Sequence, residues 1–162
     1  MTDLFPKYVI DSSSIIAGHT ELYRAENFPD IWINQKNLIL NETMYIPDQV
    51  RDEVKHIEDD ANEWLAQTNG QGFQPTDVQQ TSVDARWTAL ASTQNNKMAA
   101  GADLWVVAWE LEFEAFAVSH EAPNRPNKIP TVIQASGGKA MNLSGMIAAE
   151  KWRFVNVTAL SQ

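Results

Sequence analysis

The sequence contains no cysteine, no long hydrophobic run and fewer basic than acidic residues. Without cysteine the chain has no disulfide bond and no thiolate metal ligand, which fits a reducing compartment. No apolar run approaches the roughly 20 residues of a membrane-spanning helix, so we expect no membrane association. The 12 Lys and Arg against 21 Asp and Glu give a net charge of −9, which argues against a broad surface that coats nucleic acid.

The first residues, Met1 to Lys7, lack the basic and then apolar pattern of a signal peptide. We therefore expect a cytoplasmic protein. The 162 residues, 44% of them apolar, predict one domain over residues 1–162. Residues 155–162 are expected to form either an edge strand or a frayed tail.

Short apolar runs alternate with helical periodicity along the chain. The runs predict strands over 7–10, 44–46, 116–119 and 140–143. Apolar spacing predicts helices over 15–18, 30–40, 50–64, 83–91, 104–115, 131–135 and 144–151, with Ser144 capping the last of these. This alternation predicts an α/β protein, with three α/β/α layers and a central, mostly parallel sheet of four to five strands.

Four carboxylates stand at the ends of different predicted elements. Asp11 and Glu121 follow strands, and Asp103 opens the helix that leads into the strand before Glu121. Ligands of open α/β sheets bind beyond the carboxyl ends of the strands, so we expect these three acids to converge at one edge. Oxygen ligands suit hard cations such as Mg²⁺ and Mn²⁺.

The fourth carboxylate, Glu53, lies on the flank of a helical stripe formed by Val50, Val54 and Ile57. A carboxylate beside an apolar face is costly unless it is paired or bound to a cation. Each acid also has a simpler interpretation. Glu53 would reach water through its flexible stem, Asp103 would interact with the helix dipole, and Asp11 would stabilise a turn.

Other patterns carry less chemistry. Ser119, His120 and Glu121 do not form a hydrolase triad, because strand neighbours point to opposite faces. The three histidines lack the spacing of a zinc site, and no glycine-rich phosphate loop is present. Arg125 and Lys128 are either contacts to an RNA backbone or solvated loop charges. Trp109 lies off the apolar stripe of its helix and, with Glu110, Glu112 and Glu114, is expected to form a partner surface.

Four segments, taken in order, resemble a PIN-domain nuclease: Tyr8 to Ile16, Pro47 to Glu53, Gly101 to Asp103, and Val118 to Glu121. Further features are similar to the DUF4411 branch of PIN-like proteins, namely Phe28-Pro29, Trp32, Leu104-Trp105, Lys128 to Pro130 and Trp152 to Phe154. The resemblance runs from about residue 8 to residue 154. It implies a small α/β/α nuclease of the kind found as toxins in bacterial toxin–antitoxin pairs.

By this resemblance, Asp11, Glu53 and Asp103 are the core acids of a Mg²⁺- or Mn²⁺-dependent ribonuclease, and Glu121 is the fourth. Ser13 and Ser119 match hydroxyl residues that hold a phosphate or position a ligand. Two positions depart from the pattern. Glu121 stands where many PIN domains have aspartate, which leaves open whether it binds metal directly or through water, and Leu104 replaces a proline.

The resemblance also implies a mechanism and partners. One or two cations would activate a water for in-line attack on an RNA phosphodiester. The partners would be RNA, a cognate antitoxin protein and a second copy in a homodimer. The alternative is a catalytically silent PIN-like module that binds RNA or protein. The presence of all four acids counts against it, because a scaffold does not need them.

Overall fold

Four short parallel strands form the single sheet of the computed structural model, which describes residues 4–57, 60–94 and 96–154. The sheet order is β2-β1-β3-β4. The bounds are Tyr8–Ile10 for β1, Met44–Tyr45 for β2, Phe116–Val118 for β3 and Lys139–Met141 for β4. Every pairing is parallel; Val9, for example, aligns with Tyr45 on one side and with Ala117 on the other. The predicted α/β fold with a parallel sheet is confirmed, with four strands among the described residues.

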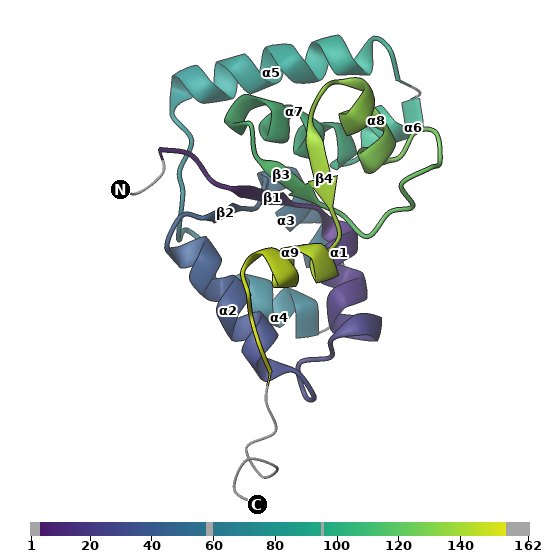
Figure 1. The fold of residues 1–162 in the computed structure, drawn as a ribbon. Helices are drawn as coiled ribbons and strands as arrows, with labels where there is room; N and C mark the ends of the chain where they lie inside the picture. Colours follow the sequence, from purple (N-terminus) through teal and green to yellow (C-terminus); the bar gives the residue numbers. More distant parts are fainter. Residues whose placement is uncertain (1–3, 58–59, 95, 155–162) are drawn as a thin grey trace, which may run out of the picture.

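Helices cover both faces of this sheet and make the three layers (Figure 1). One layer contains α5 (Asp77–Ala91), α6 (Asn96–Ala100), α7 (Asp103–Phe113) and α8 (Ile129–Ala135). The other contains α1 (Ser12–Ala17), α2 (Pro29–Leu40), α4 (Asp60–Ala66) and α9 (Leu143–Ala149), while α3 (Asp48–Lys55) packs against α1 and α4. A π-helical turn, Gly18–Leu22, continues α1. Because both faces are covered, β1 is a continuous apolar run, Tyr8-Val9-Ile10, with every residue buried.

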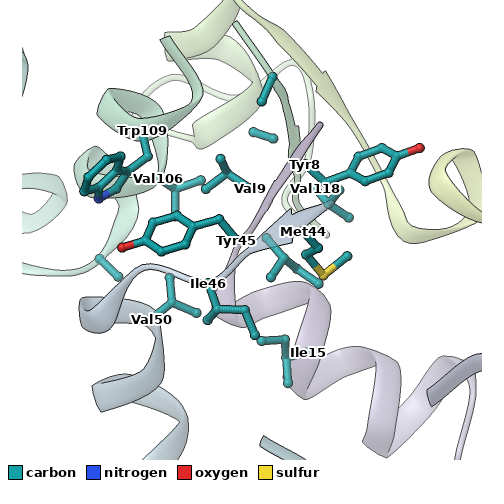
Figure 2. Close-up of a cluster of buried hydrophobic side chains, with 14 of the residues drawn as sticks. Tyr8, Val9, Ile15, Met44, Tyr45, Ile46, Val50, Val106, Trp109 and Val118 are labelled. Atoms are coloured by element: carbon teal, nitrogen blue, oxygen red, sulfur yellow. The ribbon is translucent and has the colours of Figure 1, made fainter. Parts of the chain in front are cut away.

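The core lies where the sheet meets these helices (Figure 2). Trp109 is only 2% exposed, and its ring packs 5.0 Å from Tyr45 and 5.1 Å from Phe113, measured between centroids. Its predicted role as an interface residue is therefore wrong. Glu110 is buried as well, and Glu112 is tied to Arg86 by an ion pair of 2.9 Å, so the expected partner surface is reduced to the exposed Glu114.

The predicted helix over 50–64 is two helices, α3 and α4. The apolar period continues across the break because Val50, Val54, Ala61 and Trp64 all face the same core. The spacing of apolar residues therefore predicts which face is buried, but it does not predict where the helix is interrupted.

Two smaller differences concern a short helix and a helix cap. Helix α6 was not predicted, because its short segment has no apolar period. Helix α9 is capped by Asn142, whose side chain accepts a hydrogen bond from the backbone N–H of Gly145, and not by Ser144. The predicted edge strand or tail over 155–162 lies outside the described residues.

Among the described helices, none combines the length and apolar character that crossing a bilayer requires.

Candidate metal centre at the carboxyl edge of the sheet

Three of the four predicted carboxylates meet at one edge of the sheet. One oxygen from each of Asp11, Asp103 and Glu121 lies within 4.8 Å of the others. Asp11 follows β1 and Glu121 follows the adjacent parallel strand β3, so both segments leave the sheet at its carboxyl edge. Helix α7 begins at this carboxyl edge and runs back to the start of β3. Its first residue, Asp103, therefore lies beside Asp11 and Glu121. The predicted convergence of these three acids is confirmed.

Asp11 is the most buried member, with 1% of its surface exposed. It occupies the N-cap position of α1, but its side chain makes no capping hydrogen bond. Instead, its carboxylate accepts hydrogen bonds from the hydroxyls of Ser13 and, at 3.3 Å, Ser119. Burial raises the pKa of Asp11 from 3.8 to about 6; the Ser13 hydrogen bond opposes that rise, and the charges of Glu121 and Glu53 add to it.

Asp103 is half-buried and carries the larger shift. The pKa of its carboxyl is raised from 3.8 to about 7, mostly by burial and then by the charges of Asp11, Glu121 and Glu53. The ammonium of Lys128 acts in the opposite direction. The three acids around Asp103 therefore outweigh the positive charge of Lys128.

Glu121 is held by the start of α8. Its Oε2 accepts a hydrogen bond of 2.8 Å from the backbone N–H of Ile129, and its Oε1 lies 3.6 Å from Lys128 Nζ. Its own backbone N–H donates to the Ser119 hydroxyl at 3.2 Å. These contacts orient the carboxylate toward the cluster.

Glu53 borders the cluster and lies outside the group of three. Its Oε1 accepts a 2.9 Å hydrogen bond from the backbone N–H of Ala102, and its Oε2 accepts one from the Ser12 hydroxyl. Glu53 thus ties α3 to α1 and to the residue before α7, which explains why a carboxylate is tolerated beside an apolar stripe. Gly101 is part of this arrangement, because a Cβ there would lie 3.1 Å from Glu53 Oε1.

The two predicted hydroxyl residues stand together at Asp11. The hydroxyls of Ser13 and Ser119 are 3.5 Å apart, and Ser13 also accepts a hydrogen bond from the backbone N–H of His120. Sequence reasoning missed Ser12 and Gly101 as supporting residues. The run of three serines after Asp11 was the available signal for Ser12. Gly101 stands in one of the segments that resemble a PIN domain, but that resemblance gave it no role.

The two predicted RNA contacts differ in placement. Lys128 pairs with Glu121, as described above. Arg125 has an exposed side chain, while its carbonyl accepts a hydrogen bond from the Thr131 hydroxyl at 2.7 Å. Their role toward RNA stays a prediction.

The donor set fits a divalent cation. The three closely spaced groups are all carboxylates, the ligand type that Mg²⁺ and Mn²⁺ select, and one is almost completely buried. A cation among them would offset the mutual repulsion that raises the pKa values of Asp11 and Asp103. The acidic cluster of Asp11, Asp103 and Glu121 can therefore hold a metal ion, and the geometry does not specify which one.

Comparison with known proteins gives one result. The family described as "Domain of unknown function (DUF4411)" matches residues 8–154. No curated protein and no solved structure matches the chain. The matched region contains β1 to β4 and all four acids. The chain therefore belongs to the DUF4411 family.

Proposed function

We propose that this protein is a metal-dependent ribonuclease that hydrolyses RNA phosphodiester bonds at the acidic cluster. One observation carries the proposal: three carboxylate oxygens from separate segments lie within 4.8 Å at the carboxyl edge of a parallel sheet. Ligand sites of open α/β sheets lie at this edge. An uncompensated cluster of acids is costly, so its presence indicates a cation as partner.

The chain's own residues have separate tasks in this proposal. Asp11, Asp103 and Glu121 would hold Mg²⁺ or Mn²⁺, and Glu53 adds negative charge at their border. When bound, a cation would lower the pKa of a water molecule and neutralise negative charge on phosphate oxygens. Ser13 and Ser119 fix the Asp11 carboxylate through their hydroxyls, so that it presents one orientation.

RNA as the substrate, and a role as the toxin of a toxin–antitoxin pair, are supported by the resemblance to PIN-like nucleases. Lys128 and Arg125 follow Glu121 in the same loop, and the Lys128 ammonium lies 3.6 Å from Glu121 Oε1 at the acidic cluster. That local charge would hold a phosphate backbone near a protein whose net charge is −9. The cognate antitoxin and a second copy of the chain are the proposed protein partners.

A cleavage assay with matched variants tests the enzymatic part. We expect the wild-type protein to cut single-stranded RNA with Mn²⁺ or Mg²⁺ and to stop when EDTA is added. Asp11→Asn should lower the rate at least about a hundredfold, because it removes a charge that only the cation balances. Asp48→Asn, a similar change at the start of α3, is the control and should keep the activity. If the wild-type protein does not cleave RNA when metal is added, the alternative function holds: a catalytically silent module that binds RNA or protein.

Melting curves test the metal site apart from catalysis. At a concentration 100 times the dissociation constant, Mn²⁺ should stabilise the protein by about 2.7 kcal/mol. Asp11→Asn should remove most of that gain. A melting temperature that does not change with Mn²⁺ or Mg²⁺ would exclude the metal centre.

The toxin role has its own test. Expression of the wild-type chain should arrest bacterial growth, and Asp11→Asn should not. Co-expression of the neighbouring reading frame should restore growth if it encodes the antitoxin. Normal growth with an active nuclease would refute the toxin role and leave the ribonuclease intact.

A further inference from the structure

A cavity of about 290 Å³ adjoins the acidic cluster. It lies at the carboxyl ends of β3 and β4 and is lined in part by Ser119 and Glu121. Ser119 donates to Asp11, and Glu121 belongs to the cluster itself. The cavity and the candidate metal centre therefore share a wall.

The rest of the lining combines apolar surface with polar side chains. Pro130 and Met141 contribute apolar surface, and His120, Gln134 and Asn142 contribute ring or amide groups. None of these five side chains is an acid. The cavity therefore differs from the cluster beside it, and a ligand with a flat apolar face and a hydrogen-bonding edge matches its chemistry.

Asn142 is a prepared hydrogen-bond donor. Its Oδ1 accepts the Gly145 backbone N–H at 2.8 Å as the cap of α9, which fixes the side chain and leaves the Nδ2 hydrogens for a ligand. Gln134 is exposed on α8 and offers both a donor and an acceptor. The backbone of His120 is held by Ser13 at 3.1 Å, while its ring is exposed.

We propose that this cavity binds the unstacked base of the nucleotide next to the cleaved phosphate and selects which base stands there. The proposal rests on the proposed ribonuclease function. Sequence-specific RNA recognition uses splayed bases that stack on side chains such as histidine and hydrogen-bond to amides. A volume of 290 Å³ is at the small end of ligand pockets, which suits a single base and excludes a duplex.

A second cavity, of about 370 Å³, shows by contrast what makes the first one suitable. It lies beside β2, at the opposite edge of the sheet, and its lining includes Asp48, Arg51 and Asp77. It shares no lining residue with the acidic cluster. A base bound there would not be attached to a phosphate at the metal centre.

Cleavage preference tests the selection. Oligoribonucleotides that differ only in the base next to the cleaved bond should be cut at different rates by the wild-type protein. Gln134→Ala and Asn142→Asp should each reduce that preference about tenfold. Asn142→Asp keeps an oxygen to cap α9, so the helix remains, but it removes the Nδ2 donor. Gln71→Ala, in the lining of the opposite cavity, is the matched control and should keep the preference.

Binding of nucleosides tests the cavity without cleavage. In EDTA, uncharged adenosine, cytidine, uridine and guanosine should shift the amide NMR signals of His120, Gln134 and Asn142, and ribose alone should not. Equal cleavage of all bases, or unchanged preference in both variants, would overturn the proposal while the nuclease stands. If no RNA is cleaved, the proposed function fails, and the nucleoside titration alone decides the cavity: shifts retain base binding, and their absence removes it.

Discussion

Helix α7 carries a half-buried carboxylate at its first residue and a buried one near its other end, and their surroundings differ. Asp103, the first residue of the helix, lies among Asp11 and Glu121 at the carboxyl edge of the sheet. Glu110, near the other end, is 1% exposed, and its Oε1 accepts a 2.8 Å hydrogen bond from the backbone N–H of Lys139. Gly138 packs so closely against the Glu110 carboxylate that a side chain there would collide with it.

Burial raises the pKa of both groups, but the remaining influences have opposite signs. For Glu110 the Lys139 backbone hydrogen bond and the Lys139 charge lower the pKa again. For Asp103 the neighbouring acids raise the pKa, and the charge of Lys128 lowers it. Glu110 thus has a partner supplied by the fold for one of its oxygens, the backbone N–H of Lys139 at the start of β4. Asp103 has a deficit of positive charge that the fold leaves open, which is the property of a ligand site.

Removing the charge from each carboxylate gives the largest expected contrast. Asp103→Asn should lower metal-stimulated RNA cleavage about a hundredfold or more and weaken Mn²⁺ binding, because one of three ligands loses its charge. Glu110→Gln should leave both unchanged. Cleavage rates and Mn²⁺ titrations followed by electron paramagnetic resonance measure the pair. Equal losses of cleavage and Mn²⁺ binding in the two variants would show that any buried charge on α7 is needed, and not the acidic cluster in particular.

Glu53 sharpens the comparison, because it has a backbone partner like Glu110 but borders the cluster like Asp103. Glu53→Gln keeps an acceptor for Ala102 and removes the charge. We expect cleavage to fall about 10- to 100-fold, the range for residues that support metal ligands. The exposed Glu63→Gln is the control. A loss as large as that of Asp11→Asn would indicate that Glu53 is a direct metal ligand.

The stability of the metal-free protein should reveal the cost of burying the Asp103 carboxylate among other acids. Its pKa rises from 3.8 in the unfolded chain to about 7 in the fold, so the folded state binds the proton more tightly. Stability in EDTA should therefore fall as the pH rises from about 4 to about 7. Asp103→Asn should be more stable than wild type at pH 8, on the order of 2 kcal/mol, and equal to it below pH 4.

Urea unfolding at several pH values measures this difference. Saturating Mn²⁺ should reverse the order of the two proteins, because the wild type gains a ligand-bound state. A variant less stable than wild type in EDTA at pH 8 would contradict this cost of the ionised Asp103 carboxylate.

Glu110→Gln should have the smallest effect. The folded pKa of Glu110 is raised, so its ionised form destabilises the protein at neutral pH. The amide keeps an acceptor for the backbone N–H of Lys139 and removes the buried charge, which should stabilise the protein slightly at pH 7. The gain should fade as the pH falls toward 4.5, and the exposed Glu114→Gln should show none. A destabilised Glu110→Gln protein would show that the charge on Lys139 needs its partner.

The sequence predicted the sheet and part of the site well for a common reason. The strands of a covered parallel sheet are continuous apolar runs, and the residue after each run stands at the carboxyl edge whatever the details of packing. Asp11, Asp103 and Glu121 could therefore be assigned to one place. Helical spacing marked Glu53 as a carboxylate beside an apolar stripe, and the family resemblance assigned it to the site. Its contacts to Ala102 and Ser12 join segments distant in the chain and could not be read from either signal.

The sequence alone determined the α/β class, the order of its main elements and the edge where three acids gather, because these follow from local apolar patterns and strand direction. Only the tertiary structure decided which polar and aromatic residues are buried. Helix α7 contacts the sheet on one side and α5 and α8 on others, so Trp109 and Glu110 are enclosed although a single-stripe helical wheel places Trp109 outside. A wheel describes one helix, and burial is a property of everything packed around it.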